Sequence, residues 1–119
     1  WILVSDSVIE EVGHLFVHRP VDIVAVKGKA IGIGIHELVA TKTGPLAATS
    51  EEQKLCEDFT RIFALYLARR WDTALLELEE LSRQWPDDRV IDQLIERCRA
   101  LRETPPPDDW SGVQILTEK

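Results

Sequence analysis

The sequence predicts an α+β protein in which a β-α-β-β segment, residues 1–39, precedes a helical region, residues 50–119. Two observations carry this prediction. Residues 1–39 are rich in Val and Ile, carry few charges and in part alternate with a period of two, as strands do. After residue 49 the apolar residues recur with the 3.6-residue period of amphipathic helices. Residues 40–49, ATKTGPLAAT, have the composition of a linker.

Composition restricts the class of protein. The chain has 119 residues and a net charge of −7, an acidic balance that disfavours nucleic acid as a partner. Lysines and glycines interrupt the longest apolar run, so we expect no contact with a membrane, and the first residues do not resemble a signal peptide. The two cysteines, Cys56 and Cys98, fall on apolar helix faces without metal or redox spacing, which predicts reduced core thiols of a cytoplasmic protein.

The first two expected elements are a strand and a short helix. WILVS, residues 1–5, is a run of branched apolar residues typical of a buried strand. SVIEEVG follows as a brief helix. Ser7 and Glu10 have the spacing of a capping box, and Gly13 is suited to a left-handed end of that helix.

Three strand-like stretches follow the short helix. HLFVH (14–18) and VDIVAV (21–26) are separated by Pro20, which predicts a bulge or a sheet edge. IGIGIHEL (31–38) alternates, with isoleucines on one face and Gly32, Gly34 and His36 on the other. Because glycine has no side chain, another backbone or a ligand can approach this second face closely.

Three helices are expected in the second half. A capping box of Ser50 and Gln53 begins the first. The second ends before Pro86, because proline disfavours a helical conformation in the residue that precedes it. Asp87 or Asp88 caps the third.

The second of these helices has the spacing of a tetratricopeptide repeat. The pattern is an aromatic residue, a small residue, two large apolar residues and a proline: Trp71, Ala74, Leu78, Leu81 and Pro86. A single repeat cannot bury both faces of its helix pair, so we expect the third helix and the tail around Trp110 to cover it. That tail, TPPPDDWSGVQILTEK, opens in polyproline II and ends in an apolar patch.

The run ILVSDSVIEEVG…VDIVAVKGKAIGIGIHEL resembles the last part of a class III adenylate/guanylate cyclase catalytic domain. In that family a strand ending in vS leads into a short helix, a strand ending in vKGk and a closing strand. The segments LYLARRWDTALLELEEL, WPDD and IERCRALRETPPPDDWSGVQILTEK are similar to the helical extension that follows this domain in many bacterial members. The resemblance implies a partial ferredoxin-like β-α-β-β segment at residues 1–39 and a TPR-like extension at residues 50–119.

The resemblance implies a role in making cyclic AMP or cyclic GMP, with pyrophosphate, from ATP or GTP in signal transduction. Lys27, the first lysine of KGK, matches the family's lysine that reaches the ATP polyphosphate across a dimer interface. Lys29 has no such role, and both lysines can instead serve only to keep a hairpin soluble. The family's aspartates for Mg²⁺ or Mn²⁺ and its transition-state residues have no match here, since Asp6 and Asp22 lie outside that context. We therefore expect the chain alone to be inactive.

Partners follow from the same resemblance. Part of a larger sheet cannot bury both of its edges, so we expect a homodimer, a strand-exchanged oligomer or helices folded onto the sheet. The parent enzyme can be anchored in the inner membrane by an upstream region. The alternative function is a protein–protein interaction or dimerisation module, in which Tyr66, Trp71 and Trp110 pack helices or anchor a partner.

Two further patterns do not predict a site. Gly28, Gly32 and Gly34 match no phosphate-binding loop. His14 and His18 are four residues apart and can share a strand face, but no third ligand is near them in the sequence, so no metal site is expected there.

Overall fold

The computed structural model describes residues 2–26 and 32–116. The chain divides into two compact units, each considered by itself: the sheet unit, residues 1–57 and 112–119, and the helical unit, residues 58–111. The fold class is α+β, as predicted. Among the described residues, no helix is both long enough and apolar enough to cross a membrane.

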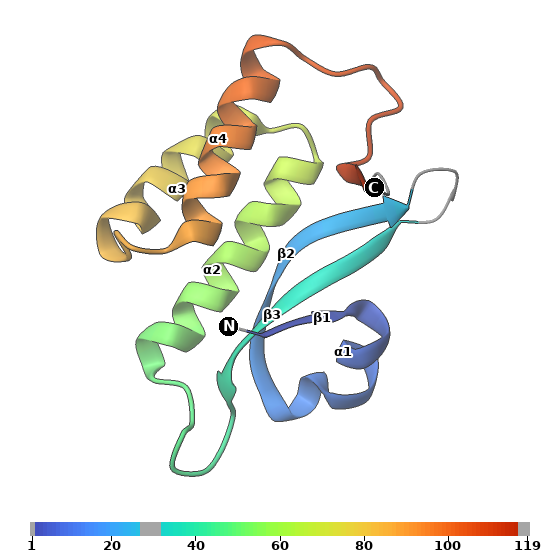
Figure 1. The fold of residues 1–119 in the computed structure, drawn as a ribbon. Coiled ribbons are helices and arrows are strands. Elements are labelled where there is room, and N and C mark those ends of the chain that lie inside the picture. Colours follow the sequence, from blue (N-terminus) through green and yellow to red (C-terminus); the bar gives the residue numbers. More distant parts are fainter. Residues whose placement is uncertain (1, 27–31, 117–119) are drawn as a thin grey trace. The chain divides into compact units, whose positions relative to one another are not determined.

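The sheet unit contains the predicted β-α-β-β order. Its elements are β1 (Ile2–Ser5), α1 (Asp6–Val12), β2 (Phe16–Val26) and β3 (Ile33–Thr41) (Figure 1). β3 lies between β1 and β2 and is antiparallel to both. β3 is therefore an inner strand of the sheet.

β2 is a single strand, whereas the sequence suggested two stretches. Its pairing with β3 shifts register between Pro20, which lies opposite His36, and Asp22, which lies opposite Ile35. One residue of β2, Val21, is thus extra, so the bulge predicted at Pro20 is confirmed. A proline lacks the N–H that the ladder needs, and a bulge is where that loss is tolerated.

The C-terminal apolar patch forms a fourth strand, which the sequence did not predict. β4 (Val113–Leu116) pairs in parallel with β2, from Ile23 opposite Val113 onward, and gives the sheet order β1-β3-β2-β4. The chain's own tail therefore covers the edge of β2, for which we expected another chain or helices. The linker is also shorter than predicted, because β3 continues to Thr41.

The caps of α1 differ from the prediction. The helix begins at Asp6, after Ser5, and the Ser7 hydroxyl lies 2.9 Å from the Ser5 hydroxyl instead of capping the backbone. Gly13 has a right-handed φ of −56° and leads into a 3₁₀ turn, Gly13–Leu15. A glycine at this position is therefore explained by close packing and not by a left-handed backbone, because a Cβ there would lie 3.1 Å from Cγ2 of Ile9.

α2 (Ser50–Leu67) begins with a capping box one residue earlier than predicted. The Thr49 hydroxyl accepts a hydrogen bond from the Glu52 N–H at 3.1 Å, and the Glu52 carboxylate accepts one from the Thr49 N–H at 2.9 Å. Thr49–Glu52 and Ser50–Gln53 both fit the capping-box pattern. The carboxylate at Glu52 is the stronger acceptor, which favours the earlier box.

The helical unit is built from the rest of α2 together with α3 (Trp71–Gln84) and α4 (Arg89–Glu103) (Figure 1). α3 and α4 form a close hairpin, and α3 ends before Pro86 as predicted. Asp88 caps α4, since its Oδ1 accepts from the N–H groups of Val90 and Ile91 at 3.0 and 3.1 Å. The core consists of apolar side chains at helical spacing: Phe59, Ile62, Phe63, Tyr66, Trp71, Ala74, Leu75, Leu78, Leu81, Val90, Ile91, Leu94, Ile95 and Cys98.

Candidate functional site

Lys27, the residue predicted to contact a polyphosphate, lies outside the described residues. So do Lys29 and Gly28 of the same motif. The chain enters this segment from Val26 at the end of β2 and leaves it toward Ile33 at the start of β3. The described strands on either side of this segment, β2 and β3, are antiparallel neighbours in the sheet.

The glycine face of β3 is occupied by the chain's own side chains. The N–H of Gly34 donates to Oδ2 of Asp6 at 2.9 Å, and a Cβ on Gly34 would overlap that carboxylate. A Cβ on Gly32 would lie 2.9 Å from Cγ2 of both Ile23 and Val113. The glycines predicted a close approach by another backbone or a ligand, whereas the groups that approach here are the side chains of Asp6, Ile23 and Val113.

Three polar side chains on this face contact one another in series, beginning with Asp6. Its Oδ1 lies 3.0 Å from Nε2 of His36, and Nδ1 of His36 lies 3.3 Å from Nδ1 of His18. The two imidazole rings meet edge to face, with centroids 5.2 Å apart. α1 supplies the aspartate, β3 and β2 supply the histidines, and the register of the β2–β3 ladder brings the rings together.

The carboxylate determines the tautomer of His36. An ionised carboxylate only accepts hydrogen bonds, so Nε2 of His36 must carry a proton and donate it to Asp6. A neutral His36 then has its lone pair on Nδ1, facing His18. Burial lowers the pKa of His18 below its usual value, and the nearby His36 and Lys42 lower it further. His18 is therefore held in its neutral form near neutral pH.

The sequence did not predict this histidine pair. The sequence suggested that His14 and His18 could share a strand face, but His14 lies outside β2, exposed in the 3₁₀ turn that precedes it. Which side chains of β2 lie on the same face of the sheet as His36 depends on the bulge at Pro20. A shift of one residue in the register turns a side chain to the other face. The available signal was only that both histidines lie in predicted strands.

The three aromatic residues singled out in the sequence lie together in the helical unit. The Trp110 ring is edge-on to Tyr66, with centroids 5.3 Å apart, and edge-on to Trp71, with centroids 5.7 Å apart. Tyr66 and Trp71 are buried, with 1% and 8% of their surface exposed, whereas Trp110 is half-buried. Trp110 therefore covers the two buried rings from the outside.

Arg69 fastens the proline-rich tail next to these rings. Its guanidinium donates to the carbonyl oxygens of Pro106 and Pro107 at 2.7 and 2.9 Å and lies over the Trp71 ring, 5.3 Å from its centroid. Its backbone has a φ of +66°, a left-handed conformation that costs a residue with a side chain about 1–2 kcal/mol. The side-chain contacts offset this cost.

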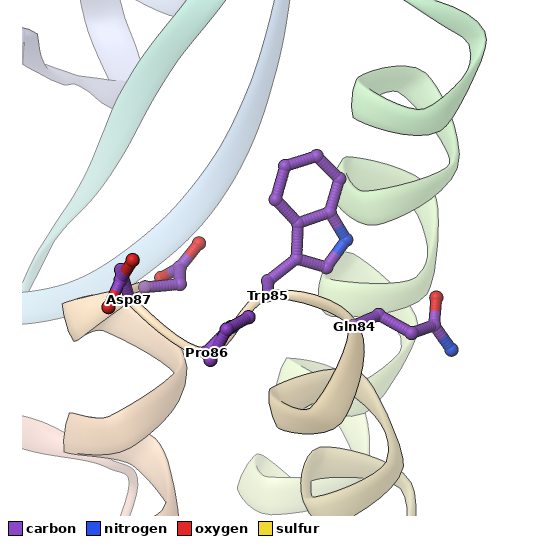
Figure 2. A pocket seen from close by; sticks show the side chains of 5 residues that line it. Gln84, Trp85, Pro86 and Asp87 are labelled. Atoms are coloured by element: carbon purple, nitrogen blue, oxygen red, sulfur yellow. The ribbon is translucent and has the colours of Figure 1, made fainter.

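An open hollow of about 330 Å³ lies at the connection between α3 and α4. Figure 2 shows the side chains around it, with the Trp85 ring at one side and Asp87 beyond Pro86. The side chains that line it include two carboxylates, Asp87 and Asp88, and no basic group. A phosphate-bearing ligand would be repelled there, and Asp88 is already engaged in capping α4.

The sequence matches no protein-family model, and neither a curated protein nor a solved structure shows significant similarity to the chain. Within residues 2–26 and 32–116, no group of three or more His, Cys, Asp or Glu side chains is placed to hold a metal ion.

Proposed function

We propose that this chain is the C-terminal region of a class III nucleotide cyclase. The observation that carries the proposal is the β1-α1-β2-β3 order, in which β2 and β3 form an antiparallel pair joined through the segment that contains the KGK sequence. The sequence resemblance assigns a polyphosphate contact to Lys27. A connection between paired strands is a suitable place for a lysine that must reach a ligand outside its own sheet.

The proposed reaction is an intramolecular phosphoryl transfer. The 3′-oxygen of the ribose attacks the α-phosphorus of ATP or GTP, and pyrophosphate leaves with cyclic AMP or cyclic GMP as the product. Negative charge increases on the leaving polyphosphate, where the ammonium group of Lys27 would stabilise it. The contribution of this chain to turnover is therefore one positive charge, and the other catalytic groups belong to the remainder of the enzyme.

The two aspartates of the sheet unit, Asp6 and Asp22, do not fit the Mg²⁺ or Mn²⁺ ions that such a cyclase needs. Asp6 is engaged with the Gly34 N–H and with His36, and Oδ1 of Asp22 accepts from the N–H of Ile23 at 2.9 Å. A two-metal site needs carboxylates that converge on ions about 4 Å apart. The proposal accordingly assigns no metal ligand to this chain and expects it to be inactive alone.

The alternative proposal is that the helical unit is a TPR-like interaction or dimerisation module. The burial of Tyr66 and Trp71 supports a packing role for these two rings, and both lie against Trp110. Trp110 itself is the one of the three with a substantially exposed surface. A partner would therefore contact Trp110 first.

The test is turnover in a protein that joins this chain to the upstream part of a class III cyclase. We expect Lys27→Ala to lower kcat/KM for MgATP by about 10- to 100-fold, the effect of losing one charged contact to a phosphate. Lys29→Ala is the matched control and should change kcat/KM less than three-fold, by about 0.6 kcal/mol at most. Equal activity of Lys27→Ala and the unmodified protein would overturn the assignment of Lys27.

Cyclase activity of the isolated chain is a second test. The chain with Mg²⁺ or Mn²⁺ and ATP should form no cyclic AMP. Formation of cyclic AMP above the rate without protein would contradict the proposal that the other catalytic groups belong to the remainder of the enzyme.

A further inference from the structure

We propose that His18 and His36 bind one divalent late transition-metal ion, with Zn²⁺ as the probe, through their Nδ1 atoms, and that Asp6 orients this site. The proposal concerns the sheet unit alone and is independent of the cyclase proposal. Its basis is the separation of the two Nδ1 atoms, 3.3 Å, and the contact of 3.0 Å between Asp6 and the opposite nitrogen of His36.

The first argument is the distance between the nitrogens. Zn²⁺ binds imidazole nitrogen at about 2.0–2.1 Å with tetrahedral angles, which places two nitrogens on one ion about 3.3–3.4 Å apart. The Nδ1 atoms of His18 and His36 are 3.3 Å apart. The separation of the two nitrogens therefore matches the one that a shared ion requires.

The second argument is the tautomer of His36. Metal-binding histidines usually donate their other N–H to a carboxylate, which fixes the ring and makes the ligating nitrogen more basic. Asp6 accepts from Nε2 of His36 and is itself held by the N–H of Gly34 at 2.9 Å. The lone pair of His36 is consequently directed to Nδ1, toward His18. Asp6 is a positioning residue here and is not a ligand.

The third argument concerns which ion the site would take. The described residues supply two imidazoles and no third ligand, so the remaining positions of the ion would be open to water or to another small ligand. Imidazole suits Zn²⁺, Cu²⁺ and Ni²⁺, whereas Mg²⁺ and Mn²⁺ prefer oxygen. The site is thus distinct in chemistry from the Mg²⁺ or Mn²⁺ centre of a cyclase.

Without a metal, the same geometry is explained by a hydrogen bond between the two rings. His18 would then carry its proton on Nδ1 and donate it to Nδ1 of His36, since the latter nitrogen has no proton. The two arrangements differ in an observable way. In the metal complex both Nδ1 atoms lack a proton, whereas in the hydrogen-bonded pair one of them carries it.

The experiment is calorimetric titration of the whole, metal-free chain with Zn²⁺ near neutral pH. We expect one site, and we expect His18→Gln to weaken it at least ten-fold. His14→Gln is the matched control, because His14 is exposed and lies outside the pair, and its Zn²⁺ affinity should equal that of the unmodified chain. Asp6→Asn should weaken binding by about 10- to 100-fold, as expected for an orienting carboxylate.

A second readout separates loss of the site from loss of the fold. Imidazole NMR resonances of His18 and His36 should both shift on addition of Zn²⁺, while those of His14 stay in place and Mg²⁺ changes none of them. The same spectra of metal-free His18→Gln report whether the sheet is intact. Equal Zn²⁺ affinity in the unmodified chain and in a folded His18→Gln, or a shift of His14 alone, would overturn the proposal.

Discussion

Arg19 and Glu37 lie opposite each other on β2 and β3 and form a buried ion pair. Nη2 and Nε of Arg19 approach Oε1 of Glu37 to 2.7 and 2.8 Å, and the two side chains have only 5% and 11% of their surface exposed. Arg19 follows His18 and Glu37 follows His36 in the sequence. Because neighbouring residues of a strand point to opposite faces, the ion pair lies on the face of the sheet opposite to the histidines. The sheet thus has a different polar contact on each side.

The first prediction concerns this ion pair. Glu37→Gln leaves the Arg19 charge buried without its counter-charge, so it should lower the free energy of unfolding by about 3–5 kcal/mol. The double variant Arg19→Met/Glu37→Leu removes both charges and should lose much less. Hydrogen exchange of the β2 and β3 amides measures the effect within the sheet unit. Equal losses in the single and double variants would contradict the argument from desolvation.

The second prediction concerns the space at Gly34. A Cβ there would overlap the Asp6 carboxylate, so Gly34→Ala should lower the stability of the sheet unit by about 1–3 kcal/mol. In an Asp6→Gly background the same substitution should cost less, because the carboxylate is gone. Gly44→Ala is the comparison for strain without crowding, since Gly44 has a φ of +93° and open space around it. Hydrogen exchange again gives the free energies.

The third prediction separates strain from contact at Arg69. Arg69→Ala removes the hydrogen bonds to Pro106 and Pro107 and keeps the left-handed backbone, so it should destabilise the helical unit by about 1–3 kcal/mol. Arg69→Gly removes the same contacts but relieves the backbone, and should be about 1 kcal/mol more stable than Arg69→Ala. Urea unfolding followed by tryptophan fluorescence tests the order. Arg69→Gly being the less stable variant would contradict it.

The fourth prediction concerns Trp110. Its ring covers Tyr66 and Trp71, so Trp110→Ala should lower the free energy of unfolding of the helical unit by about 2–4 kcal/mol. Trp85→Ala is the matched control, because Trp85 is half-buried like Trp110 but borders the open hollow, so it should cost less than Trp110→Ala. Urea unfolding monitored by circular dichroism makes the comparison without relying on the fluorescence that both variants change.

The fifth prediction concerns Cys98. Burial raises the pKa of its thiol from 9.0 to about 11. At pH 8 to 9 the thiolate is therefore nearly absent in the folded chain, and iodoacetamide should modify Cys98 only at the rate of opening or unfolding. In the unfolded chain the thiol loses its proton at lower pH, so this group lowers stability as pH rises from about 9 to about 11. Cys98→Ala should lack that part of the alkaline loss.

The sequence predicted the elements well where the signal is local. The alternation of β3, the bulge at Pro20, the end of α3 before Pro86 and the cap at Asp88 depend on residues within a few positions of one another, and all are present. The capping boxes show the limit of such signals. Adjacent pairs of residues satisfied the same pattern, and the choice between Thr49 and Ser50 depended on which side chains could reach the backbone.

The candidate sites were less predictable, because each depends on residues far apart in the sequence. The pairing of His18 with His36 requires the β2–β3 register, and a one-residue shift at the bulge would have turned His18 to the other face. The occupation of the glycine face by Asp6 requires α1 to lie over β3. Lys27, in contrast, is proposed from the motif around it in the sequence and lies outside the described residues.

By itself the sequence determined the α+β class, the order of the helices and of the first three strands, and the apolar faces of the helices, because periodicity and capping act between near neighbours. Tertiary structure alone decided that the tail returns as β4 beside β2, that Arg69 binds the carbonyl oxygens of Pro106 and Pro107, and that His36 contacts both His18 and Asp6. The physical reason is the same in each case. These contacts join segments separated by many residues, and their energy depends on register and packing that no local pattern encodes.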